Sequence, residues 1–346
     1  MGEYLASRTA FVAALTSTLA CGSCASREDP ARSLPTDTRV DATPGASIVD
    51  AAAGPEAAVL EGSASDAEES LPPIDMTGPI GGSRPADVKL PDGYDATKKH
   101  PLIVLLHGYG ATGSVQDFYL GVSREALPRG YLVALPNGTA DSTGQQFWNA
   151  TDACCDLESR APDDVGYIRD LVRQIVARYA VDPGRVYLVG HSNGAFLSLR
   201  LACEQSKRFA AVAALAGATW SDQTRCTPDS PIGVLTIHGT ADATISYKGG
   251  TLTQKQPAKS VMYPSAESTI ATFAYRNGCG TTPMRDSKVD YVADLVGAET
   301  APLRYDSCTS GGSAELWSLD GAGHVPAFGS AFMPAVLTFF ERHARR

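Results

Sequence analysis

The segment at residues 186–204 constrains the fold more than any other part of the chain. The apolar run Val186–Val189 leads into the turn-like stretch Gly190–Gly194, and a helical stretch follows to about Glu204. Consecutive apolar residues before a turn are typical of a strand buried on both faces, as in parallel sheets covered by helices. The segment therefore predicts a strand–turn–helix unit with Ser192 in the turn.

Further apolar runs and helical faces alternate along the chain from about residue 85. A helix capped by Asp163 or Asp164 has apolar residues at spacings of three and four as far as Tyr179. Ser265 caps another helix that ends at Gly278. This alternation predicts an α/β fold with a mostly parallel central sheet and helices on both faces. The other predicted strands are residues 102–106, 131–135, 210–215, 234–237 and 316–319, and the last predicted helix runs from 332 to about 343.

The first 84 residues differ in composition from the rest. Residues 1–24 hold one Arg and then the apolar run Ala10–Ala20, which is too short to span a bilayer and predicts a secretory signal. The run ends in Thr18-Leu19-Ala20-Cys21, similar to a bacterial lipoprotein cleavage box, so Cys21 is either lipidated or part of a plain cleaved signal. Residues 25–84, rich in Ala, Ser, Pro, Gly and acids, predict a disordered linker.

We therefore expect an exported protein, extracellular or in the cell envelope, with membrane attachment only through an N-terminal lipid. The net charge of −9 does not change this expectation. Between Ala25 and Met76 there are 11 Asp and Glu against 3 Arg, a sum of −8, so the remainder is about neutral. A neutral globular part, residues 85–346, offers no basic surface, and we expect no nucleic-acid partner.

The setting of Ser192, between a strand and a helix, predicts a nucleophile elbow. A serine hydroxyl is a poor nucleophile, so a base and an orienting acid must accompany it, and in such folds they follow in the order acid, then His. Among six His, only His324 and His343 lie far enough downstream. His343 ends the last predicted helix, where a solvated or dipole-facing side chain is expected. His324, in a loop after the last predicted strand, is therefore the predicted base.

The acid is predicted to be Asp242. It follows the apolar run 234–237 and a short turn, and it would fix the tautomer of His324. Asp320, on the His324 loop itself, is the rival, although an Asp there also suits a turn. His238, close to Asp242, is expected to pack a loop rather than to act in catalysis.

Two backbone N–H groups should form an oxyanion hole for the charge that develops in such a reaction. One is expected from Asn193, the residue after the nucleophile. The other is expected from Tyr109 in the loop His107–Gly110, after the strand that ends at Leu106. The alternative for this loop is a simple Gly-rich turn. The scheme requires no cofactor and no metal.

Six cysteines remain after Cys21 and Cys24 are assigned to the export region, and an even number in an exported chain predicts disulfides. Cys279 and Cys308 flank one excursion between a helix and the last strand, so we pair them. The other four are expected to tie a loop at Cys154-Cys155 to Cys203 and Cys226. A zinc site is the alternative, but no C-x-x-C with a partner spacing supports it.

Many short motifs, in order, resemble the secreted esterases of the polyhydroxybutyrate depolymerase and feruloyl esterase group, within the α/β-hydrolase fold. The resemblance covers about residues 85–346. It implies a carboxylic-ester hydrolase that works through an acyl-enzyme, with Ser192, Asp242 and His324 as the triad. The motifs are LLHGYGATG, WNATDACCD, DDVGYIRDLV, VDPGRVYLVGHSNGAFLSLRLAC, FAAVAALAG, IHGTAD, RNGC and LDGAGH.

The resemblance also implies that Trp148 and the Cys154-Cys155 neighbourhood lie near the mouth of the active site. We predict that Trp148 and His107 contact substrate, with core packing as the alternative for Trp148. His191 and Asn193 stand where depolymerases of insoluble polyester usually have a smaller residue, and Ala195 stands where many relatives have Gly. The chain also stops soon after its last predicted helix, without an added binding domain, so we expect little attack on crystalline polymer.

The expected substrates are feruloylated or acetylated polysaccharides or hydroxyalkanoate oligomers. Two alternatives remain open on this fold. One is a non-catalytic, surface-tethered glycan-binding protein, which a disrupted triad would favour, and the other is a serine peptidase.

Overall fold

The computed structural model describes residues 73–74, 77–254 and 259–345. The predicted signal, Cys21 and most of the predicted linker lie outside the described residues.

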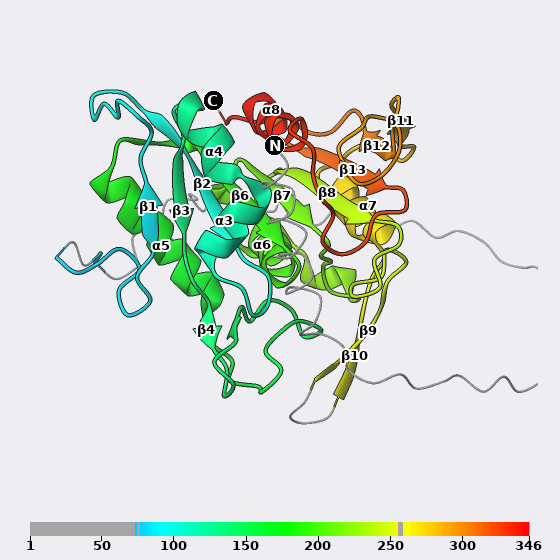
Figure 1. Cartoon of the computed structure of the whole chain (residues 1–346), viewed down its shortest axis with the longest axis horizontal. Coiled ribbons are helices and arrows are strands. Elements are labelled where there is room, and N and C mark those ends of the chain that lie inside the picture. The colour runs from blue at the N-terminus through cyan, green and yellow to red at the C-terminus, as the bar shows by residue number, and fades with distance from the viewer. Residues whose placement is uncertain (1–72, 75–76, 255–258, 346) are drawn as a thin grey trace, which may run out of the picture. The chain divides into compact units, whose positions relative to one another are not determined.

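The centre of the molecule is a nine-stranded sheet in the order β1-β3-β2-β6-β7-β8-β13-β12-β11 (Figure 1). Its six middle strands are parallel, which confirms the predicted class of sheet. At the edges, each strand is antiparallel to its neighbour: β1 to β3 at one edge, and β12 to β13 and β11 to β12 at the other. The parallel strands are β3 (Leu132–Leu135), β2 (His100–Leu106), β6 (Val181–His191), β7 (Ala211–Leu215), β8 (Gly233–Gly239) and β13 (Ser313–Leu319), and the edge strands are β1 (Asp87–Lys89), β12 (Thr300–Tyr305) and β11 (Met284–Arg285).

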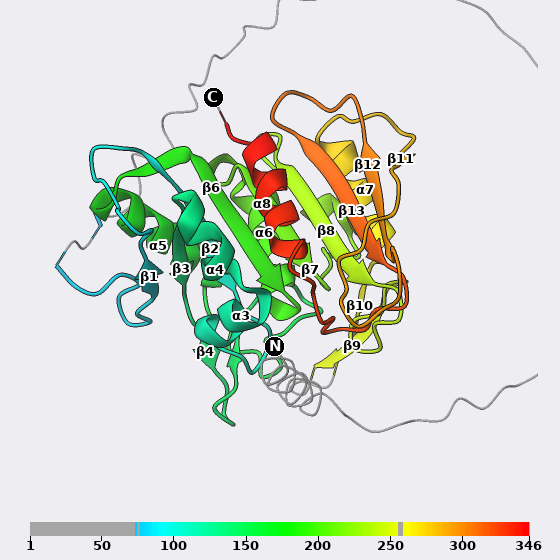
Figure 2. The same ribbon diagram turned by 45° about the horizontal axis from the view of Figure 1, so that its top comes forward.

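Helices cover both faces of the sheet, because side chains that alternate along each strand enter two separate cores. Leu188 of β6 packs in one core, whereas Tyr187 and Val189 pack in the other. Figure 2 shows α3, α4 and α8 on the near face of the sheet. The first core contains α5 (Asp164–Arg178), α6 (Asn193–Glu204) and α7 (Ala266–Arg276), and the second contains α3 (Gly113–Leu120), α4 (Val122–Ala126) and α8 (Phe332–Arg342).

The predicted helix starts agree with the observed caps. Asp163 caps α5, and its side chain accepts a hydrogen bond from the N–H of Gly166. Ser265 caps α7 in the same way. The helix α7 ends at Arg276, two residues before Gly278, whose φ of 63° is in the left-handed region.

Several short elements were not predicted from the sequence. Helices α3 and α4 have only 8 and 5 residues, too few for a helical periodicity to be recognised. Two small antiparallel sheets lie outside the central one, and the sheet of β9 and β10 projects from the body as a hairpin (Figure 1). Within the described residues, no helix combines the length and apolar composition needed to cross a membrane. The small sheets consist of β4 (Thr139–Ala140) with β5 (Gln146–Phe147) and of β9 (Gly250–Gln254) with β10 (Lys259–Tyr263), and the 3-10 turns are η1 (Leu127–Arg129), η2 (Ser206–Arg208) and η3 (Gln223–Arg225).

The folded part begins earlier than the predicted boundary at residue 85. The N–H of Gly81 donates to the side chain of Gln174 in α5. Arg84 donates to Asp164 at 2.6 Å, and its guanidinium carbon lies 3.7 Å from the centroid of the Tyr167 ring. Residues 77–84 therefore belong to the α/β domain. The linker prediction is wrong for them, because composition alone does not reveal these long-range partners.

The disulfides confirm one predicted pair and correct the others. Cys279 bonds to Cys308, as predicted. The predicted link between the Cys154-Cys155 loop and Cys203 or Cys226 is wrong, because Cys154 bonds to Cys155 and Cys203 bonds to Cys226. The physical reason is the length of α6. Cys203 lies near its C-terminal end, about 15 Å from the N-terminal end where Cys154 lies beside Asn193.

The buried Arg84–Asp164 ion pair leads to a prediction on stability. The Asp164 side chain is 0% exposed, so Asp164→Ala would leave the Arg84 guanidinium without its carboxylate partner. We expect a loss of about 3 kcal/mol in the free energy of unfolding, at the low end of such changes because Arg84 is 22% exposed. Urea unfolding followed by circular dichroism measures it. As a control, Glu341→Ala breaks the exposed ion pair with Arg129 and should cost less than about 1 kcal/mol.

Candidate active site

Ser192 lies on a sharp turn between β6 and α6. Its φ of 53° and ψ of −120° are strained for a residue with a side chain. Glycine is required on both sides, because a Cβ at Gly190 would collide with the carbonyl of Gly194, and a Cβ at Gly194 with the carbonyl of Leu106. This is the backbone geometry of a nucleophile elbow.

The three predicted triad side chains meet at one edge of the sheet. His324 Nε2 lies 2.9 Å from Ser192 Oγ, and His324 Nδ1 lies 2.7 Å from Asp242 Oδ2. A carboxylate can only accept a hydrogen bond, so Nδ1 carries the ring proton in the neutral histidine. Nε2 is therefore left to accept a hydrogen bond from the Ser192 hydroxyl.

Asp242 is held in an ionised state by its surroundings. Burial by itself would raise the pKa of this carboxyl. Hydrogen bonds from His238, His324 and the N–H of Ile245 outweigh the burial and keep the pKa of Asp242 well below its usual range. The other carboxylate oxygen accepts the N–H groups of Thr244 and Ile245 at 2.8 and 2.9 Å. The carboxylate of Asp242 therefore stays negatively charged at neutral pH, where it accepts the hydrogen bond from His324 Nδ1.

Asp320, His343 and His238 do not take the place of a triad residue. Asp320 is half exposed and forms an ion pair with Lys288, so it does not orient His324. His343, at the end of α8, donates from Nδ1 to the Phe339 carbonyl. His238 is buried, with Nε2 2.8 Å from the Ile245 carbonyl and 3.5 Å from Asp242, so it packs the loop that carries the acid.

The two predicted oxyanion donors are free to bind a ligand. Within residues 77–254 and 259–345, the backbone N–H groups of Tyr109 and Asn193 have no acceptor. Their neighbours in the Gly-rich loop are engaged, since the N–H of Gly108 donates to Gln116 Oε1 and the N–H of Gly110 to the Gln146 carbonyl. Gln116 was not singled out in the sequence, because a lone Gln on a short helix belongs to no motif.

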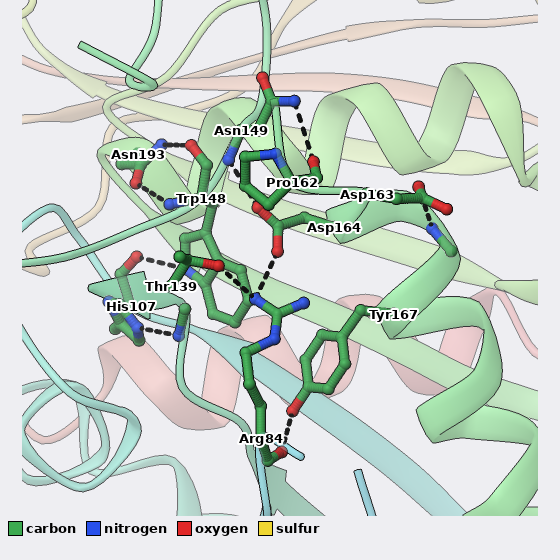
Figure 3. Close-up of polar contacts among 12 residues, drawn as sticks. Arg84, His107, Thr139, Trp148, Asn149, Pro162, Asp163, Asp164, Tyr167 and Asn193 are labelled. Atoms are coloured by element: carbon green, nitrogen blue, oxygen red, sulfur yellow. Dashed lines mark hydrogen bonds and ion pairs between the residues drawn. The ribbon is translucent and has the colours of Figure 1, made fainter. Parts of the chain in front are cut away.

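Trp148 and His107 are both 0% exposed, so neither presents surface to a substrate in this structure. Their polar atoms are engaged within the protein. His107 Nδ1 donates to the Gly108 carbonyl, and His107 Nε2 accepts from the N–H of Gly138. Burial lowers the pKa of His107 to about 4, which keeps the ring neutral. The prediction that they contact substrate is therefore wrong for this structure, in which both side chains are buried and Trp148 is bonded to His107 and Asn193 (Figure 3).

His191, next to the nucleophile, faces away from the hydroxyl. Its Nε2 lies 3.1 Å from the His324 carbonyl oxygen, which can only accept a hydrogen bond. Its Nδ1 lies 3.3 Å from Gln116 Oε1. Burial lowers the pKa of His191 to about 3, and electrostatic repulsion from His324 adds a smaller effect in the same direction. The ring is therefore neutral, and it contacts the backbone of the loop that carries His324.

The sheet, its two helical layers and the elbow define the α/β-hydrolase fold. A solved acetyl xylan esterase from Aspergillus awamori is similar, with a TM-score of 0.53 at 14% identity over 74% of this chain and 93% of that one. At this identity the similarity shows the fold alone.

The family is shown by sequence. The model of the family Esterase, described as "Putative esterase", matches residues 78–277, more than half of the chain, and the chain belongs to this family. Feruloyl esterase B of Piromyces equi is 28% identical over 70% of this chain. Feruloyl esterase C of Emericella nidulans is 31% identical over 56% of it. The chain spans 42% and 62% of the lengths of these two relatives.

The depressed pKa of Asp242 predicts how stability depends on pH. A carboxyl whose pKa is lower in the folded state stabilises that state above its unfolded pKa, near 4, and this contribution is lost as the pH falls toward the folded pKa. The free energy of unfolding of the wild type should therefore exceed that of Asp242→Asn most above pH 5. The difference should shrink from pH 4 to pH 3. Urea titrations at these pH values measure it, with Asp92→Asn at an exposed turn as the control.

Proposed function

We propose that this member of the esterase family hydrolyses carboxylic esters through an acyl-enzyme. The observation that carries this function is the hydrogen-bond chain from Ser192 through His324 to Asp242. The two free N–H groups of Tyr109 and Asn193 support it, because they supply what a developing oxyanion needs. The family membership supports the same reaction class.

In the proposed mechanism, Ser192 Oγ attacks the carbonyl carbon of the ester while His324 Nε2 takes the hydroxyl proton. The carbonyl oxygen becomes an oxyanion and accepts hydrogen bonds from the N–H groups of Tyr109 and Asn193. As the tetrahedral intermediate collapses, the C–O bond to the alcohol breaks and His324 gives the proton to the leaving oxygen. Water then repeats the sequence on the acyl-enzyme and releases the acid. Asp242 stays ionised throughout and stabilises the imidazolium.

For the substrate, we propose esters of hydroxycinnamic acids with polysaccharides, of the feruloyl type. The names of the two fungal relatives support this choice over hydroxyalkanoate oligomers. An exported location suits a polymeric substrate, and it follows from the predicted signal at residues 1–24, which lies outside the described residues.

The nucleophile is tested by Ser192→Ala. We expect turnover of p-nitrophenyl acetate to fall by on the order of 10⁴-fold or more, because the attacking oxygen is lost while the fold remains. A fluorophosphonate probe should label the wild type at Ser192, as the oxygen bonds to phosphorus and fluoride leaves. Ser287→Ala, in an exposed loop, should keep full activity and labelling. Undiminished turnover by Ser192→Ala would exclude this mechanism, and an unlabelled wild type would favour a non-catalytic binder.

The base is tested by the pH dependence of kcat/KM between pH 5 and 8. Activity should fall on the acid side, because a protonated His324 cannot accept the Ser192 proton. His107 and His191 have pKa values of about 4 and 3, so they do not change charge in this range. His324→Gln should lose activity as strongly as Ser192→Ala, whereas His343→Gln should keep the wild-type profile. A profile without an acid limb would contradict the role of His324.

The acyl preference is tested with methyl ferulate, acetylated xylan and soluble hydroxybutyrate oligomers at equal ester concentration. We expect the highest kcat/KM for methyl ferulate. Faster hydrolysis of the oligomers would overturn the feruloyl preference and leave the ester hydrolase in place.

A further inference from the structure

Trp148 connects the two segments that carry the proposed oxyanion donors. Its backbone N–H donates to Asn193 Oδ1 at 2.7 Å, and its carbonyl accepts Asn193 Nδ2 at 2.8 Å. On the other side, its indole Nε1 donates to the His107 carbonyl at 3.0 Å. Figure 3 shows the contacts of Trp148 with Asn193 and with His107. Trp148 therefore forms a bridge from the start of α6 to the loop after β2.

We propose that Trp148 is a positioning residue that sets the separation of the Tyr109 and Asn193 N–H groups in the oxyanion hole. This role rests on the proposed function. The two donors follow different strands, Tyr109 in the loop after β2 and Asn193 at the start of α6, so the chain itself does not fix their distance. Oxyanion donors must come within about 2.7–3.1 Å of the same oxygen to be effective. Trp148 supplies this constraint, because its backbone binds Asn193 at the start of α6 while its indole binds the loop at His107.

The far side of the Trp148 segment is anchored as well. The N–H of the next residue, Asn149, donates to Asp164 Oδ2 at 2.7 Å, and its side chain donates to the Pro162 carbonyl at 3.0 Å. The carboxylate of Asp164 is itself paired with Arg84 (Figure 3). The segment is thus fixed between a buried ion pair and the elbow.

The ring of Trp148 is fixed by packing. It lies against the His107 ring, with centroids 4.9 Å apart, and stacks on Tyr167 at 6.4 Å. Both nitrogens of His107 are hydrogen-bonded within the protein, to Gly108 and Gly138. A contact to the His107 carbonyl is therefore a contact to a stiff loop. Two residues further on, this loop presents the N–H of Tyr109.

The test is Trp148→Phe, which keeps an aromatic ring but removes the N–H that donates to the His107 carbonyl. We expect kcat and kcat/KM for p-nitrophenyl acetate to fall together, by roughly 10- to 100-fold, which is less than the loss of a whole donor. The second readout is inhibition by an alkylboronic acid. Ser192 Oγ adds to boron, its proton passes to His324, and a boron-bound oxygen occupies the oxyanion position. The Ki should rise by a similar factor.

Trp317→Phe is the matched control, because Trp317 is also buried but lies in β13 and packs in the other core. It should lower the melting temperature without changing kcat or the Ki. Should Trp148→Phe fold poorly, Asn193→Ala is the second variant. It removes the two contacts to the Trp148 backbone and keeps the N–H of residue 193, and it should raise the Ki in the same way.

These experiments distinguish a failure of the positioning role from a failure of the proposed function. A wild-type kcat and Ki in Trp148→Phe, or in Asn193→Ala where the former does not fold, with Ser192→Ala inactive, would overturn the positioning role. Full activity of Ser192→Ala would instead overturn the function on which that role rests. A raised Ki in the variants with an unchanged Ki in Trp317→Phe would support the role of Trp148.

Discussion

The parallel pairing of β2, β6, β8 and β13 with their neighbours is the constraint on which the rest of the structure depends. Leu106 of β2 pairs with Gly190 of β6, and Leu319 of β13 pairs with Gly239 of β8, so these strands end at the same edge of the sheet. The sheet is covered by helices on both faces, which leaves the ends of the strands as the place for polar side chains. Ser192 thus comes within hydrogen-bond distance of His324.

A second constraint is the burial of polar groups below this edge. Asp242, His107 and Asn193 are almost completely removed from water, and each is hydrogen-bonded within the protein. A buried polar group without a partner costs about 1–3 kcal/mol, so each of these bonds both stabilises the fold and fixes a direction. The strained backbone of Ser192 is held by its surroundings, because its N–H donates to the Leu215 carbonyl and α6 begins at the next residue.

Much of the fold could be predicted, because it follows from local patterns. Continuous apolar runs identified the parallel strands, and spacings of three and four identified α5 with its cap at Asp163. The antiparallel edge strands and the short helix α3 could not be predicted, since their stability comes from long-range packing rather than from periodicity. Only one of the three disulfides was predicted, for a related reason, because spacing along the chain did not reveal that Cys154 and Cys203 lie near opposite ends of one helix.

For the candidate site, the sequence alone determined the types of reacting group and their order. A serine after a strand, an aspartate after a later strand and a histidine after the last one follow from the chain without any coordinates. Only the tertiary structure decided that Asp242 rather than Asp320 faces His324, and that Trp148 is buried between Asn193 and His107. The reason is that such contacts join segments far apart in the chain. They depend on packing distances, which local composition and spacing do not encode.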